Sequence, residues 1–190
     1  MTTQPIRNKN HIKQISLYFQ NRGELRNCLL FIMGIHTALR ISDMLRLKWS
    51  DVYDFNNNCV RREFTISERK TRKSKIIAVN QSVIESIMKL FKQINPKPDN
   101  FLFAHPHIDK AISRIQAYRI LKSGAENVCT EPVSCHSLRK TFGYHLWKRG
   151  TSLVIIMDIY NHSSYAITKR YLGITQDDKN TAYLELEFST

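Results

Sequence analysis

Acidic residues are scarce in this 190-residue chain, in which 16 Asp and Glu face 29 Lys and Arg and leave a formal net charge of +13 at pH 7. The sequence pI is about 9.8. A surface of this charge attracts polyanions, and nucleic acid is the commonest of them. The composition therefore favours a partner that carries phosphates.

Cysteine is also scarce, and its spacing follows no pattern. The four cysteines, Cys28, Cys59, Cys129 and Cys135, form no C-x-x-C pair and have no histidine at zinc-finger spacing. Neither a metal site nor a disulfide framework is predicted from such an arrangement. We therefore expect reduced thiols, no metal and no cofactor.

Long hydrophobic runs and linkers are missing as well. The longest apolar run, Cys28 to Ile35, is too short to span a bilayer, and residues 1–10 lack the apolar core of a signal peptide. No Gly/Ser linker or low-complexity tract marks an internal boundary. We expect one compact, soluble, cytoplasmic domain with no membrane partner.

Positive charge is concentrated in one part of the chain. The last residues instead carry acidic side chains at 177, 178, 185 and 187. The basic stretch is the better candidate for contact with phosphate, although a Lys/Arg run is equally typical of a solvated hairpin face. Its members are Arg61, Arg62, Arg69, Lys70, Arg72, Lys73 and Lys75.

Hydrophobic periodicity predicts a mainly α-helical domain with a small antiparallel β-sheet, an α+β fold. Val60, Phe64 and Ile66 alternate with polar residues and precede a second apolar run at 76–79, which predicts a β-hairpin with its tip near 69–74. A short strand is expected over 101–103. Helices are expected over 25–35, 41–47, 83–94, 109–122, 137–149, 153–160 and 166–172.

Four blocks of the sequence carry the residue types that metal-free cleavage of DNA requires. That reaction needs a nucleophile, a proton donor for the departing sugar oxygen, and cations or donors around the non-bridging phosphate oxygens. The blocks are Thr37 to Trp49 with Arg40, Lys70-Thr71, His136-Ser137-Leu138-Arg139, and His162 followed nine positions later by Tyr171.

In this order and spacing, the blocks resemble the catalytic domain of tyrosine recombinases of the phage integrase family. The resemblance runs from about Leu25 to Tyr171. It implies strand cleavage without metal or ATP through a 3′-phosphotyrosyl link, and it assigns a role to each matching residue. Tyr171 is the nucleophile, Arg40 and Arg139 clamp the phosphate, Lys70 is the general acid, His136 accepts or orients a proton, and His162 donates a hydrogen bond.

The resemblance also implies an organisation for the chain. Residues 1–24 are an N-terminal extension, 25–176 the catalytic domain, and 177–190 a C-terminal tail of the kind that the family exchanges between subunits. The implied partner is double-stranded DNA, bound by a tetramer on two duplexes, and the implied source is a prokaryote, phage or mobile element. Because so few residues precede Leu25, the chain is expected to be a minimal recombinase, a remnant or an excised domain.

For several of these catalytic roles, other residues of the sequence are alternatives. Tyr160, Tyr165 and Tyr183 compete with Tyr171, and Lys73 and Lys75 compete with Lys70. His162 follows Tyr160-Asn161, where the family more often has Leu-Gly. Further contacts to the DNA backbone are expected from Arg69, Arg72, Lys73, Lys75 and Lys140.

Three other functions are consistent with parts of the pattern. A type IB topoisomerase-like enzyme would use the same residues, and would relax plasmid without exchanging strands. A non-catalytic DNA-binding regulator or integrase remnant would explain the charge without chemistry. A plain helical scaffold leaves the order of the motifs unexplained.

Overall fold

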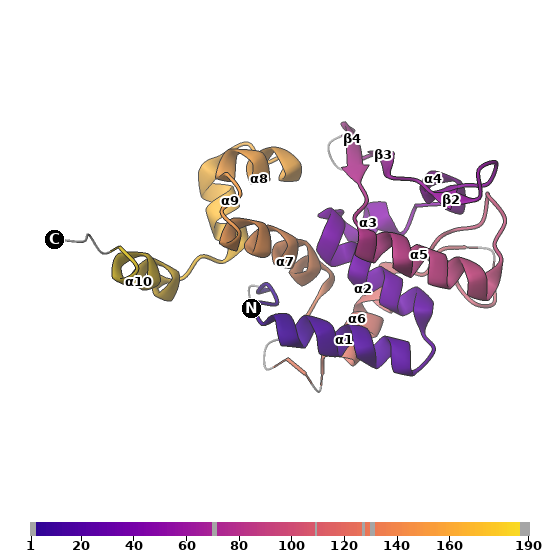
Figure 1. Cartoon of the computed structure of the whole chain (residues 1–190), viewed down its shortest axis with the longest axis horizontal. Helices are drawn as coiled ribbons and strands as arrows, with labels where there is room; N and C mark the ends of the chain where they lie inside the picture. The colour runs from indigo at the N-terminus through magenta and orange to yellow at the C-terminus, as the bar shows by residue number, and fades with distance from the viewer. Residues whose placement is uncertain (1–2, 70–71, 109, 127, 130–131, 187–190) are drawn as a thin grey trace.

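The computed structural model describes residues 3–69, 72–108, 110–126, 128–129 and 132–186. Helices dominate these residues, and two small antiparallel sheets lie at one side of them (Figure 1). This architecture confirms the predicted mainly α-helical domain with a small antiparallel sheet.

Helix α2 (Leu25–Thr37) forms the centre of the main core, and helix α1 (Lys9–Asn21) packs against it. Helix α1 begins at Asn8, whose side chain accepts a hydrogen bond from the Asn10 backbone N–H, and it buries Ile15 and Phe19. Helix α2 is buried on nearly every side because it contacts α1 and three later helices. Part of the predicted N-terminal extension is thus a helix of the same core.

Two very short helices lead into the sheets. The sheets pair their strands in an antiparallel manner, and Phe64 and Ile66 point into the core while the residues between them are exposed. The predicted hairpin is therefore confirmed, with its antiparallel strands at 63–67 and 74–78. The elements are α3 (Ile41–Met44), α4 (Trp49–Val52), β1 (Tyr53–Asp54), β2 (Cys59–Val60), β3 (Glu63–Ser67) and β4 (Ser74–Ala78).

Two longer helices follow, α5 (Gln81–Ile94) and α6 (Arg114–Ala125). Helix α6 begins later than predicted because Ser113 and Gln116 form a capping box. The predicted strand over 101–103 is wrong. Leu102 and Phe103 are buried apolar side chains, and only isolated bridges, Lys48↔Phe101 and Ala104↔Ala111, form there.

The last four helices are α7 (Cys135–Lys148), α8 (Leu153–Tyr160), α9 (Tyr165–Leu172) and α10 (Gln176–Leu184). Helix α7 packs against α2, where Leu138 contacts Gly34 so closely that a Cβ at Gly34 would collide with it. Helices α8 and α9 pack with α7 around a second, smaller cluster that includes Ile156, Tyr160 and Leu172. Figure 1 shows the unpredicted α10 beyond α9, at one end of the molecule.

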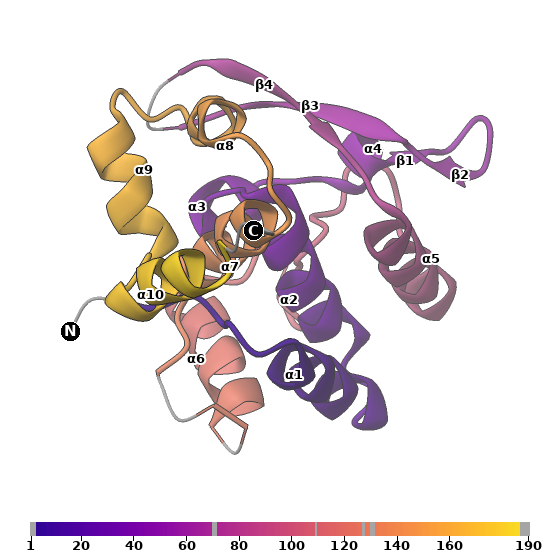
Figure 2. The same cartoon turned by 60° about the vertical axis from the view of Figure 1, so that its left-hand side comes forward.

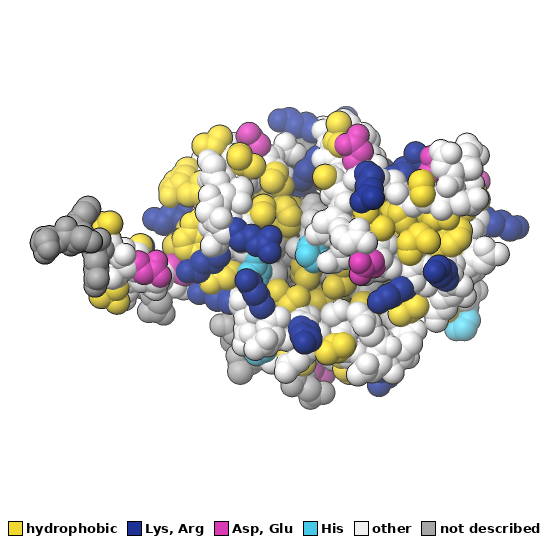
Figure 3. Space-filling model, in the orientation of Figure 1, with side chains coloured by type: hydrophobic (Ala, Val, Ile, Leu, Met, Phe, Trp, Pro, Cys, Tyr) yellow, Lys and Arg dark blue, Asp and Glu magenta, His cyan; other side chains and the backbone are white. Residues whose placement is uncertain are grey.

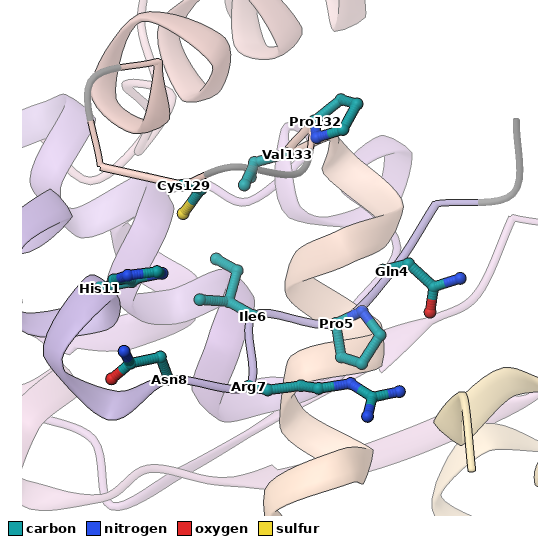
Figure 4. Close-up of a pocket in the computed structure, with 9 residues that line it drawn as sticks. All are labelled: Gln4, Pro5, Ile6, Arg7, Asn8, His11, Cys129, Pro132 and Val133. Carbon is teal, nitrogen blue, oxygen red and sulfur yellow. The ribbon is translucent and has the colours of Figure 1, made fainter. Parts of the chain in front are cut away.

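The residues ahead of α1 tie these C-terminal helices to the core. The Ile6 backbone N–H donates to Thr141 Oγ1 at 2.8 Å, and Arg7 Nη2 donates to the Gly173 carbonyl at 2.5 Å. In Figure 4, the Ile6 side chain points toward Val133 and Cys129, whereas the Arg7 side chain extends away from them. The segment therefore joins α7 to the end of α9.

In the part of the chain that the structure describes, none of the helices combines the length and the apolar character of a bilayer span.

Candidate active site

Arg40 stands at the start of α3, directly after the turn that ends α2. Ala38 ends α2 in the left-handed conformation with a φ of 56°, which turns the chain before Arg40. Arg40 Nη1 lies 2.7 Å from Glu68 Oε1, and the Glu68 side chain has no exposed surface. The Arg40 side chain is 20% exposed, so its guanidinium remains open to a ligand on one side.

Arg139 is at the centre of the site and is 2% exposed. Its guanidinium donates to the carbonyl of Ala38 through Nη1 and to the carbonyl of Tyr160 through Nη2 at 3.0 Å. It also lies over the Tyr160 ring, 4.7 Å from the ring centroid. Arg139 therefore links the turn before Arg40 to the end of α8.

His136 and Tyr171 meet across α7 and α9. His136 Nδ1 lies 3.4 Å from Tyr171 Oη. Desolvation lowers the pKa of His136, and Arg139, Arg114, Lys140 and Arg40 lower it further. The lowered pKa favours the neutral imidazole, which is the form that can accept a proton.

The environment of the Tyr171 phenol has two opposing effects on its acidity. Burial raises the pKa of Tyr171, while Arg139 and Arg40 act to lower it. Burial is the larger effect, so Arg139 and Arg40 do not by themselves bring the pKa of this tyrosine below its ordinary value. Lys140 Nζ lies 5.5 Å from the centroid of the same ring.

His162 lies beside Tyr171 in the turn between α8 and α9. The two ring centroids are 5.1 Å apart, and His162 Nδ1 is 3.0 Å from Thr168 Oγ1. Burial lowers the pKa of His162 to about 4, with further contributions from Arg139 and Arg40. This histidine is therefore neutral at pH 7.

The hairpin contributes a lysine to the site. Lys75 Nζ donates to the carbonyl of Ile159 at 2.5 Å, which joins β4 to the last turn of α8. Burial is the main cause that lowers the pKa of Lys75 to about 8; Arg139 contributes to this shift, and Glu68 opposes it. Lys70, to which the resemblance assigns the general acid, lies outside the described residues. Figure 2 shows the end of β3 and the start of β4 close to α8.

A hollow of about 740 Å³ opens next to this cluster. Arg40, His136 and Arg139 line one part of it, and Arg114 and Tyr118 of α6 line another. Sequence analysis missed Arg114 and Tyr118, since no motif surrounds them. It also missed Glu68, an acidic residue that directly precedes the basic residues of the hairpin turn.

The residues expected to contact the DNA backbone divide into two groups. Arg69, Arg72 and Lys73 are exposed on the hairpin turn. Lys75 and Lys140 point inward, and Lys140 Nζ donates to the Thr3 carbonyl at 2.6 Å. The face in Figure 3 carries many Lys and Arg side chains and few acidic ones.

The competing tyrosines differ in their surroundings. Tyr160 is fully buried, and its hydroxyl donates to the Arg139 carbonyl, so it is a core residue. Tyr165 and Tyr183 are exposed. Among the described residues, no three His, Cys, Asp or Glu side chains come together as a metal ion would require.

The arrangement of helices is that of the tyrosine recombinase catalytic domain. A crystal structure of XerA recombinase superposes with a TM-score of 0.78 over 98% of this chain and 66% of that chain, at 16% identity. A post-cleavage complex of XerH recombinase with its difH DNA superposes with a TM-score of 0.75 over 94% of this chain and 51% of that one, at 18% identity.

The sequence itself defines the family. Residues 8–177 match the model of the phage integrase family, so the chain belongs to that family. A relative named probable integrase/recombinase YoeC, from Bacillus subtilis, is 39% identical over 95% of this chain and 94% of its own length. A tyrosine recombinase of Thermosipho africanus is 23% identical over 88% of this chain, which spans 56% of that protein.

Proposed function

We propose that this protein is a site-specific DNA recombinase that cleaves and rejoins strands through a 3′-phosphotyrosyl intermediate, with Tyr171 as its nucleophile. The observation that carries the proposal is the 3.4 Å approach of His136 Nδ1 to Tyr171 Oη, beside two arginines that act electrostatically on the same phenol. A nucleophile with a neutral base next to it and cations around it is what attack on a phosphodiester requires.

In the first step, Tyr171 Oη attacks the scissile phosphorus while its proton passes to His136 Nδ1. The bond from phosphorus to Tyr171 Oη forms as the bond from phosphorus to the 5′ oxygen breaks. Because burial raises the pKa of Tyr171, ionisation is coupled to proton transfer and to the arrival of the phosphate among the cations.

Arg40, Arg139 and His162 stabilise the charge on the non-bridging oxygens. A guanidinium holds two oxygens in a bidentate way, which suits the partly open Arg40. The Thr168 hydroxyl can donate either to the Ser164 carbonyl or to Nδ1 of the neutral His162, and in the second case the Nε2–H is left to donate to the phosphate.

A lysine of the hairpin protonates the departing 5′ oxygen. We assign this role to Lys70 on the basis of the resemblance. Lys75 is the alternative on the same hairpin, because its pKa of about 8 suits proton donation near neutral pH. A 5′ hydroxyl from a partner duplex then attacks the phosphotyrosyl bond, so the bond energy is conserved and neither metal nor ATP enters.

Double-stranded DNA is the proposed partner. Arg69, Arg72 and Lys73 are exposed on the hairpin, and the hollow beside the cluster is open to a strand. Among the proteins of similar fold, XerH is bound to difH and a lambda integrase dimer to a COC′ core site. We further propose a tetramer on two duplexes that works in the bacterial cytoplasm. Exposed apolar residues of the tail, Tyr183 and Leu184, are suited to contact a second subunit.

Covalent capture tests the proposal and also selects the target site. The protein is incubated with a pool of nicked suicide duplexes whose bases around the nick are random. Loss of the short fragment beyond the nick prevents religation and traps the adduct. We expect a protein–DNA band on a denaturing gel and an enriched sequence in the trapped DNA. If the protein binds the duplexes noncovalently and forms no adduct, the result would instead support a non-catalytic DNA-binding regulator.

A further inference from the structure

Glu68 is a buried carboxylate in the most basic part of the chain. The residue is 1% exposed, and it directly follows the last residue of β3. Its Oε1 lies 2.7 Å from Arg40 Nη1, and its Oε2 accepts a hydrogen bond from Asn161 Nδ2 at 3.1 Å. One side chain thus contacts both the arginine at the start of α3 and the residue directly before His162.

The backbone of Glu68 also closes the turn of the hairpin. Its N–H donates to the Lys73 carbonyl at 3.0 Å, and its carbonyl accepts from the Arg72 N–H at 2.8 Å. The exposed cations of this turn are therefore joined to the site through the same residue. Glu68 therefore contacts Arg40 with its side chain and Arg72 and Lys73 with its backbone.

Asn161 connects Glu68 to the turn of His162. It ends α8 in the left-handed conformation, with a φ of 53°. Glycine adopts this conformation most readily, and asparagine is among the few other residues that tolerate it. Asparagine adds an amide that glycine lacks, and here that amide donates to the buried carboxylate.

We propose that Glu68 is a positioning residue for strand cleavage, which holds the Arg40 guanidinium and the His162 turn in one arrangement through its two carboxylate oxygens. The inference rests on the proposed function, and Glu68 itself touches no reacting atom. Glu68 forms an ion pair with Arg40 at the buried Nη1, and a guanidinium carries five N–H donors, so those on the other nitrogens remain for phosphate oxygens. Its negative charge also offsets the mutual repulsion of Arg40, Arg139 and Lys75, which all act electrostatically on one another.

Glu68→Gln separates this role from a merely structural one. The amide keeps the shape and one acceptor oxygen but loses the charge that holds Arg40. Since the variant is more positive by one charge, its affinity for duplex DNA should be unchanged or higher. The rate of cleavage of bound DNA should nevertheless fall between about 10-fold and 100-fold, because misplacement of a phosphate clamp by an ångström has effects of that size.

Asn161→Gly provides a second and independent variant. Glycine keeps the left-handed turn without strain and removes only the amide that contacts Glu68. The capture rate should fall in the same direction as for Glu68→Gln. In the double variant, the two effects should be clearly less than multiplicative, because both substitutions act through the Glu68 side chain.

The experiment measures single-turnover covalent capture on nicked duplex at saturating protein, together with the dissociation constant from fluorescence anisotropy. Glu63→Gln is the matched control, since Glu63 lies exposed on strand β3, which directly precedes Glu68, and should behave as the wild type. Slower capture with undiminished DNA affinity in Glu68→Gln and Asn161→Gly supports the inference. Should Glu68→Gln fail to fold, Asn161→Gly decides alone.

Two outcomes overturn the inference, and they are distinguishable. Adduct formation by both variants at the wild-type rate removes the positioning role and leaves the recombinase intact. Absence of any adduct with the wild-type protein removes the proposed function, and the positioning role is lost with it.

Discussion

Arg139 and Tyr160 form two hydrogen bonds with each other, and each residue donates one of them. Arg139 Nη2 donates to the Tyr160 carbonyl at 3.0 Å, and the Tyr160 hydroxyl donates to the Arg139 carbonyl at 2.5 Å. The guanidinium lies over the same tyrosine's ring. The proposed phosphate clamp on α7 is thus part of the packing that attaches α8 and α9, so chemistry and stability are coupled at this position.

Replacement of the two arginines should therefore have different consequences for stability. Arg139→Lys cannot reach both carbonyls, and a buried acceptor left without its partner should lower the free energy of unfolding by about 1–3 kcal/mol. Arg40→Lys keeps its charge in a partly exposed position, so the change should stay below about 1 kcal/mol. Both should slow capture by roughly 10²-fold, as loss of one donor to a developing oxyanion does. Urea unfolding and capture rates on the same samples test this, and equal stability of the two variants would contradict it.

Gly143→Ala should disturb the packing of Tyr160 against α7. A Cβ at Gly143 would collide with the Tyr160 hydroxyl and would lie 2.7 Å from Leu172 Cδ2. Overpacking of this kind should cost about 1–3 kcal/mol of unfolding free energy, and it should slow capture because Tyr160 supports Arg139. In Gly143→Ala with Tyr160→Phe, the hydroxyl that the methyl group meets is gone, so the total loss should be smaller than the sum of the single losses. If the two losses of unfolding free energy were fully additive, the methyl group at position 143 would not collide with the Tyr160 hydroxyl, which would contradict the prediction.

Acid should destabilise the protein through His162. Its folded pKa of about 4 lies below the ordinary value of 6.5, chiefly because of burial. The unfolded chain therefore takes up this proton first, and the free energy of unfolding falls as pH falls from about 6.5 toward 4. His162→Gln should flatten the dependence of unfolding free energy on pH in that window. His107→Gln, which removes an exposed histidine, is the control, and an unchanged slope in His162→Gln would contradict the assignment.

Local signals in the sequence account for much of the fold. The alternation around Phe64 and Ile66 and the apolar spacing before Asn95-Pro96 correctly predict the hairpin and α5. The strand predicted over 101–103 fails because a short apolar run is the same signal for a strand and for a buried loop, and only a partner strand separates the two. Helix α1 has a cap at Asn8 and buried positions at Ile15 and Phe19, but its contribution to the core depends on the later helices that it meets.

The site is predictable only where its residues lie in recognisable blocks. The structure brings together the five described residues of these blocks, namely Arg40, His136, Arg139, His162 and Tyr171. Tyr160 is distinguished from Tyr171 by its complete burial. The proposed role of Glu68 was not predictable, because it depends on contacts with Arg40 and Asn161, which are distant from Glu68 in the sequence. The opposing effects on the Tyr171 phenol also depend on packing, since burial outweighs the cations that the sequence places nearby.

The central claim is that the Tyr171 hydroxyl forms the covalent bond to DNA, and Tyr171→Phe tests it most directly because it removes a single oxygen. Tyr165→Phe and Tyr183→Phe are the matched controls, since both of those side chains are exposed. Tyr160→Phe is less suitable, because it breaks the bond to the Arg139 carbonyl. On the nicked duplex pool, the wild type and both controls should form the adduct, whereas Tyr171→Phe should bind DNA with unchanged affinity and form none. Adduct formation by Tyr171→Phe at the wild-type rate would contradict the account.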